Sequence, residues 1–222
     1  MFMFSAPGDP ISAQEWELRE FRLSQSCVGT ACTLTANNTF VQTNPFGPLF
    51  GGTDTQSQKF QAAFLNQVPR LAAKSIPNIT MSTGSAFDGP QSDEQAPSNN
   101  DYFIQGQSNT AFLSQITSKL ASIGRSDLTA HNILDRATTQ SCAGCHELAV
   151  GRPLGAGLTW PASLGFVQVN ELGSLSSALT GTFLPARAKV LVNFINANCA
   201  DAGAAPADDG TTLGGSAVGA AN

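Results

Sequence analysis

The chain has 222 residues, of which 41% are hydrophobic and only 12% are charged, and its formal net charge at pH 7 is −5. Lys and Arg form no cluster that could meet phosphates, which argues against nucleic-acid binding, and no apolar run approaches the length of a membrane span. The length suffices for one or two domains with a real core. The low charge and the many Ser, Thr, Asn, Gln, Gly and Ala residues are typical of exported proteins.

The N-terminal region has strand character. Residues Met1–Pro7 lack a basic segment and a long apolar stretch, so we expect no signal peptide there and interpret the chain as a mature or truncated product, or as the C-terminal part of a longer precursor. Apolar residues from Trp16 to Leu23 predict a strand with a bulge at Arg19-Glu20. Asn37-Asn38 lies between two strand-like runs, which predicts a hairpin turn.

Three cysteines lie outside the central motif described below, namely Cys27, Cys32 and Cys199. In an exported protein two of them should form a disulfide and the third should be free or pair between chains, because three is an odd number. The short Cys27–Cys32 loop closes easily, which favours that pair. A bond from either of them to Cys199 would instead tie the two ends of the chain together, and this alternative stays open.

Three stretches place apolar residues at helical spacing. They are Phe60, Phe64, Val68 and Leu71; Phe112, Leu113, Ile116, Leu120 and Ile123; and Leu128, Ile133, Leu134 and Ala137. Thr53 or Asp54 should cap the first helix, Pro69 should bend its end, and Gly124 should stop the second. Residues 82–101 are polar and predict a long exposed loop.

The third predicted helix, which Thr129 or Ser126 can cap, runs into Cys142-Ala143-Gly144-Cys145-His146. Two cysteines three positions apart and a following histidine form the attachment pattern of a c-type haem. Each thiol can add to one vinyl group of a single haem, and His146 can then supply the proximal nitrogen to the iron. With five Cys and two His in the chain, chance would produce this pattern in roughly one such chain in a thousand.

Three other interpretations of the motif compete with haem. A zinc site needs a second pair of ligands at short spacing, which the sequence does not offer. A thioredoxin-like redox pair needs a buried strand before the turn, and residues 136–141 do not resemble one. A structural disulfide between Cys142 and Cys145 would leave His146 without a role. The haem interpretation is therefore favoured.

The run from Cys142 to Leu154 resembles the small single-haem cytochromes c, in which a Gly-Pro-x-Leu-like turn follows the haem histidine. This resemblance covers roughly Thr129 to Asn198. It implies a mainly α, cytochrome c-like helical haem domain over residues 128–199. An N-terminal extension with a β-hairpin and helices would occupy residues 1–127, and a flexible Ala/Gly-rich tail residues 200–222.

The resemblance also implies roles for residues after the motif. Pro153 matches the proline whose backbone carbonyl accepts a hydrogen bond from the second ring nitrogen of the haem histidine, although Arg152 interrupts the Gly-Pro pair. Trp160 is expected to cover the porphyrin or to be an ordinary core tryptophan. Three short segments are similar to parts of uncharacterised secreted bacterial proteins, a likeness that implies no activity. They are residues 143–146, 160–166 and 183–185.

The sixth iron ligand is the main departure from this family. Its members usually take a methionine downstream of the motif, whereas all three methionines here lie upstream. Met81 is the first candidate because thioether ligation suits electron carriers. His131 is the second, but it lies eleven residues before Cys142, about 16 Å away if one helix contains both. Water, Lys189 or an empty position are the remaining alternatives.

The features together predict a function. Pro185 should open a last helix, and the pairing of that helix with the one before the motif is typical of small cytochromes c. We expect a periplasmic or extracellular monohaem c-type cytochrome with one covalent haem c and its iron, which passes single electrons between redox partner proteins. The alternatives are a haem-based sensor or enzyme with an open sixth coordination site, and an assembly or adhesion domain with a structural haem. The sequence leaves the oligomeric state open.

Overall fold

The computed structural model of the chain describes residues 2–4, 15–94 and 98–199. Helices make up 45% of the structure and strands 18%, so the protein is mixed α/β, and the prediction of a mainly α, cytochrome c-like fold is wrong. One strand pairing joins Glu17 to Asp93, and the apolar periodicity of one segment cannot reveal such pairing. The chain forms two compact units, Met1–Pro185 and Ala186–Asn222. The core and the site described below belong to the first unit.

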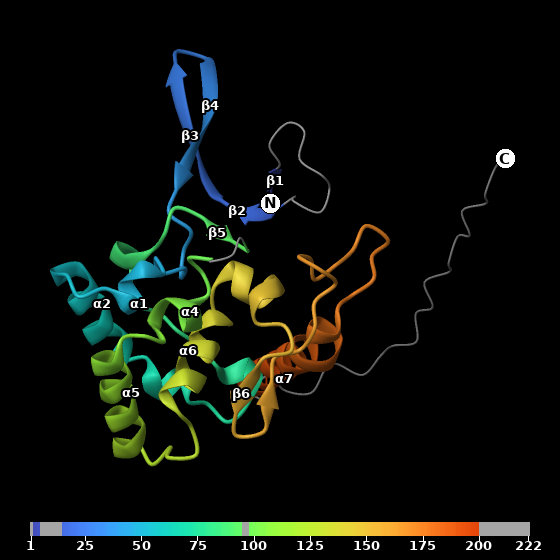
Figure 1. Cartoon of the computed structure of the whole chain (residues 1–222). Helices are drawn as coiled ribbons and strands as arrows, with labels where there is room; N and C mark the ends of the chain where they lie inside the picture. The colour runs from blue at the N-terminus through green and yellow to red at the C-terminus, as the bar shows by residue number, and fades with distance from the viewer. Residues whose placement is uncertain (1, 5–14, 95–97, 200–222) are drawn as a thin grey trace, which may run out of the picture. The chain divides into compact units, whose positions relative to one another are not determined.

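The strands of the described residues form three small antiparallel sheets (Figure 1). They are β1 (Phe2–Phe4), β2 (Glu15–Leu18), β3 (Glu20–Val28), β4 (Ala31–Thr39), β5 (Ser92–Asp93), β6 (Pro153–Gly155) and β7 (Leu158–Thr159). The first sheet has the order β1-β2-β5, so that a segment from the middle of the chain pairs with one near its start. The second sheet is the β3–β4 hairpin. The third is the β6–β7 hairpin, which directly follows the Cys-X-X-Cys-His motif.

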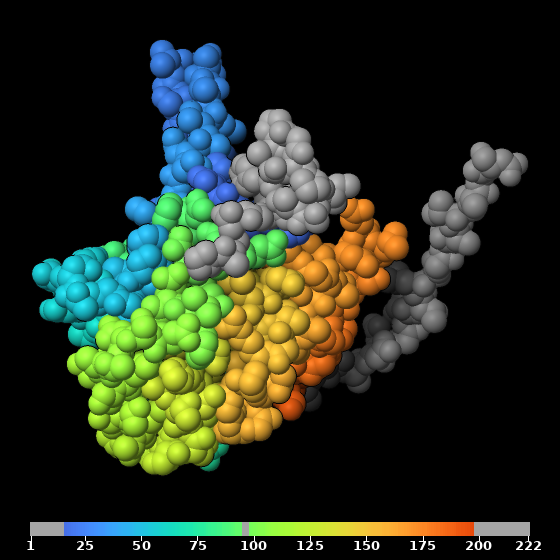
Figure 2. All heavy atoms as spheres, viewed as in Figure 1, coloured from blue at the N-terminus to red at the C-terminus, as the bar shows by residue number. Residues whose placement is uncertain are grey.

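The β3–β4 hairpin stands out from the rest of its unit (Figures 1 and 2). Almost all of its side chains are exposed. Its turn lies at Gly29-Thr30, where Gly29 adopts a φ of +62° that suits glycine, and Cys27 and Cys32 close the tip with a disulfide. The hairpin turn predicted at Asn37-Asn38 is wrong, because both asparagines lie within β4. The break between β2 and β3 at Arg19 falls where the sequence predicted a bulge.

The helices carry most of the core. The helical segments are α1 (Pro48–Gly51), α2 (Thr55–Leu65), α3 (Val68–Leu71), η2 (Ile76–Asn78), η3 (Ser85–Phe87), α4 (Tyr102–Gly106), α5 (Thr110–Ser122), α6 (Ala130–Thr138), η4 (Gly144–Leu148), η5 (Leu179–Phe183) and α7 (Leu184–Cys199). Within the described ranges, none is both long and apolar enough to cross a membrane.

The three helices predicted before the motif are present. Asp54 caps α2 by accepting hydrogen bonds from two backbone N–H groups, Gly124 follows α5 with a φ of +69°, and Thr129 caps α6. Pro69 lies in the first turn of α3, so the first predicted helix is divided into α2 and α3. The polar stretch 82–101 is less irregular than expected, because it contains η3 and β5.

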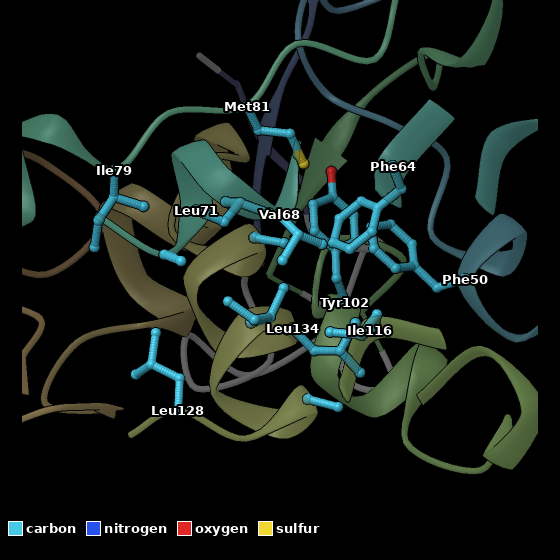
Figure 3. Close-up of a cluster of buried hydrophobic side chains, with 14 of the residues drawn as sticks. Phe50, Phe64, Val68, Leu71, Ile79, Met81, Tyr102, Ile116, Leu128 and Leu134 are labelled. Atoms are coloured by element: carbon cyan, nitrogen blue, oxygen red, sulfur yellow. The ribbon is translucent and has the colours of Figure 1, made fainter. Parts of the chain in front are cut away.

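Aromatic and aliphatic side chains from α1 to α6 form one apolar core (Figure 3). The rings of Phe50 and Tyr102 stack with centroids 4.4 Å apart, and both side chains are fully buried. Phe64 and Leu134 belong to the same core. The core therefore draws on residues from both sides of the boundary predicted at residues 127 and 128.

Arg136 fastens α6 to two other segments from inside the protein. Its side chain is fully buried. Nη1 donates to the carbonyl oxygens of Leu71 and Ala73, both at 2.8 Å, and Nε donates to that of Leu154 at 2.7 Å. These bonds hold the segment after α3 and the strand β6 against the helix that leads into the Cys-X-X-Cys-His motif. Burial lowers the pKa of Arg136 to about 10, so its guanidinium stays charged at neutral pH.

Candidate functional site

The motif begins four residues after the end of α6 and is held from both sides. In the cap of α6, Thr129 Oγ1 accepts from the N–H of Asn132 at 3.1 Å, and Asn132 Oδ1 accepts from the N–H of Thr129 at 3.0 Å. At the start of the motif, Ser141 Oγ accepts from the N–H of Gly144 at 2.9 Å. The N–H of Ala143 donates to Ser92 Oγ in β5, also at 2.9 Å. Local caps and one distant strand thus fix the backbone of the motif.

Glycine is required inside the motif. A Cβ atom on Gly144 would lie 1.7 Å from the carbonyl oxygen of Thr138 and 2.6 Å from Ser141 Oγ. No side chain fits this approach between the end of α6 and the wide helical turn η4. The second of the two residues between the cysteines is therefore dictated by packing.

Cys142, Cys145 and His146 line one pocket of roughly 320 Å³, a volume within the range of about 300–1,000 Å³ that is typical of small-molecule sites. The remaining lining residues are Ile76, Ile79, Thr139, Gln140, Ser141, Trp160 and Phe183. Trp160 is 3% exposed, and its ring lies 5.7 Å from that of Phe183. The structure thus places Trp160 in the same pocket wall as the motif.

The two motif cysteines are half-buried and form no disulfide. Burial raises the pKa of the Cys142 thiol and raises that of Cys145 to about 11, with a smaller contribution to the latter from the neighbouring Cys142. Both groups are therefore neutral thiols near pH 7. Within the described residues, no three His, Cys, Asp or Glu side chains gather into a group that could hold a metal ion by themselves.

The ring of His146 is fixed by a carbonyl from a distant loop. Its Nδ1 lies 3.0 Å from the backbone oxygen of Phe166. A carbonyl oxygen only accepts hydrogen bonds, so Nδ1 donates in this contact, and in the neutral ring Nε2 then keeps the lone pair that a metal requires. The resemblance to cytochromes c assigned this carbonyl to Pro153. In the structure Pro153 lies in β6, opposite Thr159, and the residue whose carbonyl contacts His146 is Phe166.

The loop that contains Phe166 also forms hydrogen bonds to the backbone of the motif. Trp160 Nε1 and Gln168 Nε2 both donate to the carbonyl oxygen of Cys145, at 3.3 and 3.2 Å. Gln168 in turn accepts from the hydroxyl of the fully buried Ser176. The loop that follows β7 therefore closes over the motif through hydrogen bonds to both Cys145 and His146.

The two candidates for the sixth ligand lie away from the pocket lining. Met81 is 7% exposed and belongs to the apolar core (Figure 3), whereas Ile79, two residues earlier, lines the pocket. His131 is exposed on α6, where its ring contacts Phe103 with centroids 5.5 Å apart. Among the described residues that line the pocket, none carries a thioether or an amine, and His146 has the only imidazole.

Two arginines have roles that sequence reasoning missed. Arg152 pairs with Asp101 and, at 3.3 Å, with Asp135, which anchors the chain just after the motif. Arg136 directly precedes Ala137 in α6, and the apolar spacing that marked Ala137 gave no signal that the neighbouring arginine is buried. The sequence could not identify Phe166 as the partner of His146, because the contact uses a backbone carbonyl and every residue has one.

The pocket can accept a largely apolar group that is attached through two thiols and ligated by one imidazole. Unpaired thiols, an imidazole with a free Nε2 and an aromatic wall are the donor set that haem c needs. The residues present therefore fit that group. No protein-family model matches the chain, and neither the curated proteins nor the solved structures compared with it gave a match.

Proposed function

We propose that the chain binds one haem c covalently through Cys142 and Cys145, with His146 as the axial iron ligand, and that it transfers single electrons between redox partner proteins in the periplasm or outside the cell. The observation that carries this proposal is the state of His146. Its Nδ1 is occupied by the Phe166 carbonyl, and its ring lines the same pocket as the two unpaired thiols.

Each side chain in the pocket has a distinct task in this proposal. Each thiol adds across one vinyl group, so that sulfur bonds to one carbon, the thiol hydrogen goes to the other, and nothing leaves. The Phe166 carbonyl orients the imidazole and raises its basicity through the Nδ1–H hydrogen bond. Trp160, Phe183 and Ile79 cover the pocket with apolar surface and exclude water. The bound haem would supply the one-electron couple, and its ligand and burial would set the potential.

The disulfide at the hairpin tip supports the proposed location. Cys27 and Cys32 are exposed and form a disulfide, and such bonds persist in oxidising compartments such as the periplasm. Thioether attachment of haem takes place in the same compartments. The two kinds of cysteine in this chain thus point to one environment.

A second candidate function follows from the missing sixth ligand. The described residues that line the pocket offer the iron only His146, and Met81 is packed in the core. An iron with one protein ligand leaves a position for a small molecule, as a gas sensor or a haem enzyme requires. This candidate shares the covalent haem with the first and differs only in what occupies the sixth position.

The attachment itself is tested by mass. The chain is produced together with a cytochrome c maturation system, and its intact mass should exceed that of the polypeptide by one haem. The double variant Cys142→Ala/Cys145→Ala should carry none. The matched control, Cys27→Ser/Cys32→Ser, also loses two cysteines and should still carry haem. A wild-type chain without haem, made by a system that loads a reference cytochrome, would overturn the proposal.

The spectrum then separates the two candidate functions. An electron carrier with a protein-supplied sixth ligand should be low-spin in both redox states and should change little with carbon monoxide. Neither Met81, which is packed in the core, nor the exposed His131 lines the pocket, so a low-spin protein that becomes high-spin in Met81→Ala but not in His131→Ala would show that Met81 moves to the iron when haem binds. A wild-type protein that is already high-spin and binds carbon monoxide at once supports the sensor or enzyme candidate instead.

A further inference from the structure

A line of three aromatic rings leads away from the pocket behind His146. The centroids of the His146 and Phe166 rings are 5.6 Å apart. Phe166 stacks on Trp16 with centroids 5.8 Å apart and planes within 4° of parallel. His146 and Phe166 are also joined by the 3.0 Å contact between Nδ1 and the carbonyl oxygen. The three residues come from η4, the loop after β7, and β2.

The burial of these residues changes along the line. His146 lines the pocket, Phe166 is buried at 4% exposure, and Trp16 is half-buried. The line thus begins at the proposed haem ligand, passes through the buried Phe166 and ends at a half-buried residue. The backbone of Trp16 is fixed, because its N–H donates to Glu94 Oε1 at 3.1 Å and its strand pairs with β1 and β5.

We propose that His146, Phe166 and Trp16 form the route by which an electron passes between the haem and a one-electron partner at the surface. This inference rests on the proposed function. Electron tunnelling decays less steeply through covalent bonds, hydrogen bonds and ring contacts than across gaps, and this line contains no gap. A bound haem would give up one electron, and the partner would gain it. The rings act as a bridge, so no bond breaks and no proton moves along them.

The route is tested with a photoactive ruthenium complex attached to a surface histidine of the haem-loaded protein. Arg19→His places the label three residues from Trp16, and His131→Gln in the same protein keeps the labelling to one site. The exposed native His131 on α6 takes the same label in a second protein and serves as the control. Laser excitation then gives the rate of electron transfer from each label to the haem.

Trp16→Leu and Phe166→Leu should each slow transfer from the label at position 19 several-fold and leave the rate from His131 unchanged. Trp16→Phe keeps an aromatic ring and should retain most of the rate. Trp16 does not line the pocket, so the haem spectrum and potential should not change in Trp16→Leu, which separates slower transfer from a change at the haem. Equal rates in the wild type and in both Leu variants would overturn the proposed route, as would equal slowing from both labels.

The ring stack has its own readout without haem. In the Cys142→Ala/Cys145→Ala chain, Phe166→Leu should alter the fluorescence of Trp16, and it should have no effect once Trp16 is replaced by Leu. Unchanged Trp16 fluorescence would show that the stack does not form and would also overturn the route. Failure of the proposed function would be distinguished from failure of the route, because the wild-type chain would then show no added haem in its intact mass.

Discussion

The guanidinium of Arg136 and the carbonyl oxygen of Leu71 are 2.8 Å apart, although the two residues are separated by 65 positions in the sequence. The same Nη1 atom reaches Ala73, three residues before Ile76 in the pocket wall. Nε of the same side chain reaches Leu154, eight residues after His146. One buried side chain therefore sets the position of the motif's helix relative to two segments that border the pocket.

Replacing Arg136 by Met should destabilise the fold by about 3 kcal/mol or more, because each buried carbonyl left without a donor costs about 1–3 kcal/mol. Arg136→Lys should recover only part of the loss, since one ammonium cannot reach both groups of carbonyls. The measurement is urea unfolding of each variant. Arg70→Met, at an exposed arginine in α3, is the control and should change stability by well under about 1 kcal/mol. A stable Arg136→Met protein would show that these carbonyls find other donors.

Gly144→Ala should destabilise the protein by about 1–3 kcal/mol, because the added methyl group would overlap the Thr138 carbonyl. Thermal unfolding of the haem-free chain gives this value without any contribution from the cofactor. Gly181→Ala is the matched control, since a Cβ at that position meets nothing within 4 Å. If both variants melt at the wild-type temperature, the turn after Ser141 has room to relax.

The buried thiols predict a pH-dependent reactivity. Thiolate is the nucleophile in alkylation, and Cys145 in the folded haem-free chain has its pKa raised to about 11 by burial. Iodoacetamide should therefore modify Cys145 slowly at pH 8 and faster as the pH rises toward 11. Unfolding in urea should restore the rate of an ordinary cysteine. Peptide mapping by mass spectrometry measures each site separately, and rapid labelling of folded protein at pH 8 would contradict the burial.

The raised pKa of Cys145 also predicts how the stability of the fold depends on pH. Because the pKa of Cys145 is higher in the folded chain than its ordinary value of 9.0, the unfolded chain releases its proton first as the pH rises. The free energy of unfolding of the haem-free chain should therefore fall between about pH 9 and pH 11. Cys145→Ala should remove this contribution to the slope.

The hairpin disulfide should act locally. Cys27 and Cys32 close a short loop at the tip of the exposed β3–β4 hairpin, and the expected stabilisation of such a loop is about 2 kcal/mol. Cys27→Ser/Cys32→Ser should speed amide hydrogen exchange in β3 and β4, because an isolated two-stranded hairpin is marginal in water. Exchange in α5 should be unchanged. Faster exchange in both places would show that the hairpin supports the core.

The parts of the structure that the sequence predicted are those with local causes. Asp54 and Thr129 cap helices through side chains a few residues from the N–H groups they bind, and Gly124 adopts a backbone conformation that favours glycine. The pairing of β2 with β5 joins Leu18 to Ser92, and β5 is a strand of only Ser92 and Asp93 with no apolar alternation to mark it. The fold class was predicted wrongly because it was inferred from the resemblance of the motif region to cytochromes c, whereas most of the strand residues lie in the β3–β4 hairpin outside that region.

In the candidate site too, the sequence identified the residues with a local pattern and missed those placed by distant contacts. Cys142, Cys145 and His146 belong to one five-residue motif, and Trp160 was identified because a large aromatic residue follows a cofactor motif. The sequence did not identify the partner of His146, since the contact uses the backbone carbonyl of Phe166 and does not depend on the type of side chain. The position of Met81 in the core was equally hidden, because a methionine serves in cores and as a ligand with the same sequence signature.

The residues that hold Cys145 and His146 in place are synthesised after the motif itself. Every hydrogen bond that the loop after β7 makes to Cys145 or His146 comes from a residue synthesised later than the motif, and Phe166 follows His146 by 20 positions. At about 5–20 residues per second, synthesis of that stretch takes roughly one to four seconds. The nascent chain therefore carries Cys142 and Cys145 for that interval before it contains the groups that enclose them, so the closed form of the motif is a late event in folding.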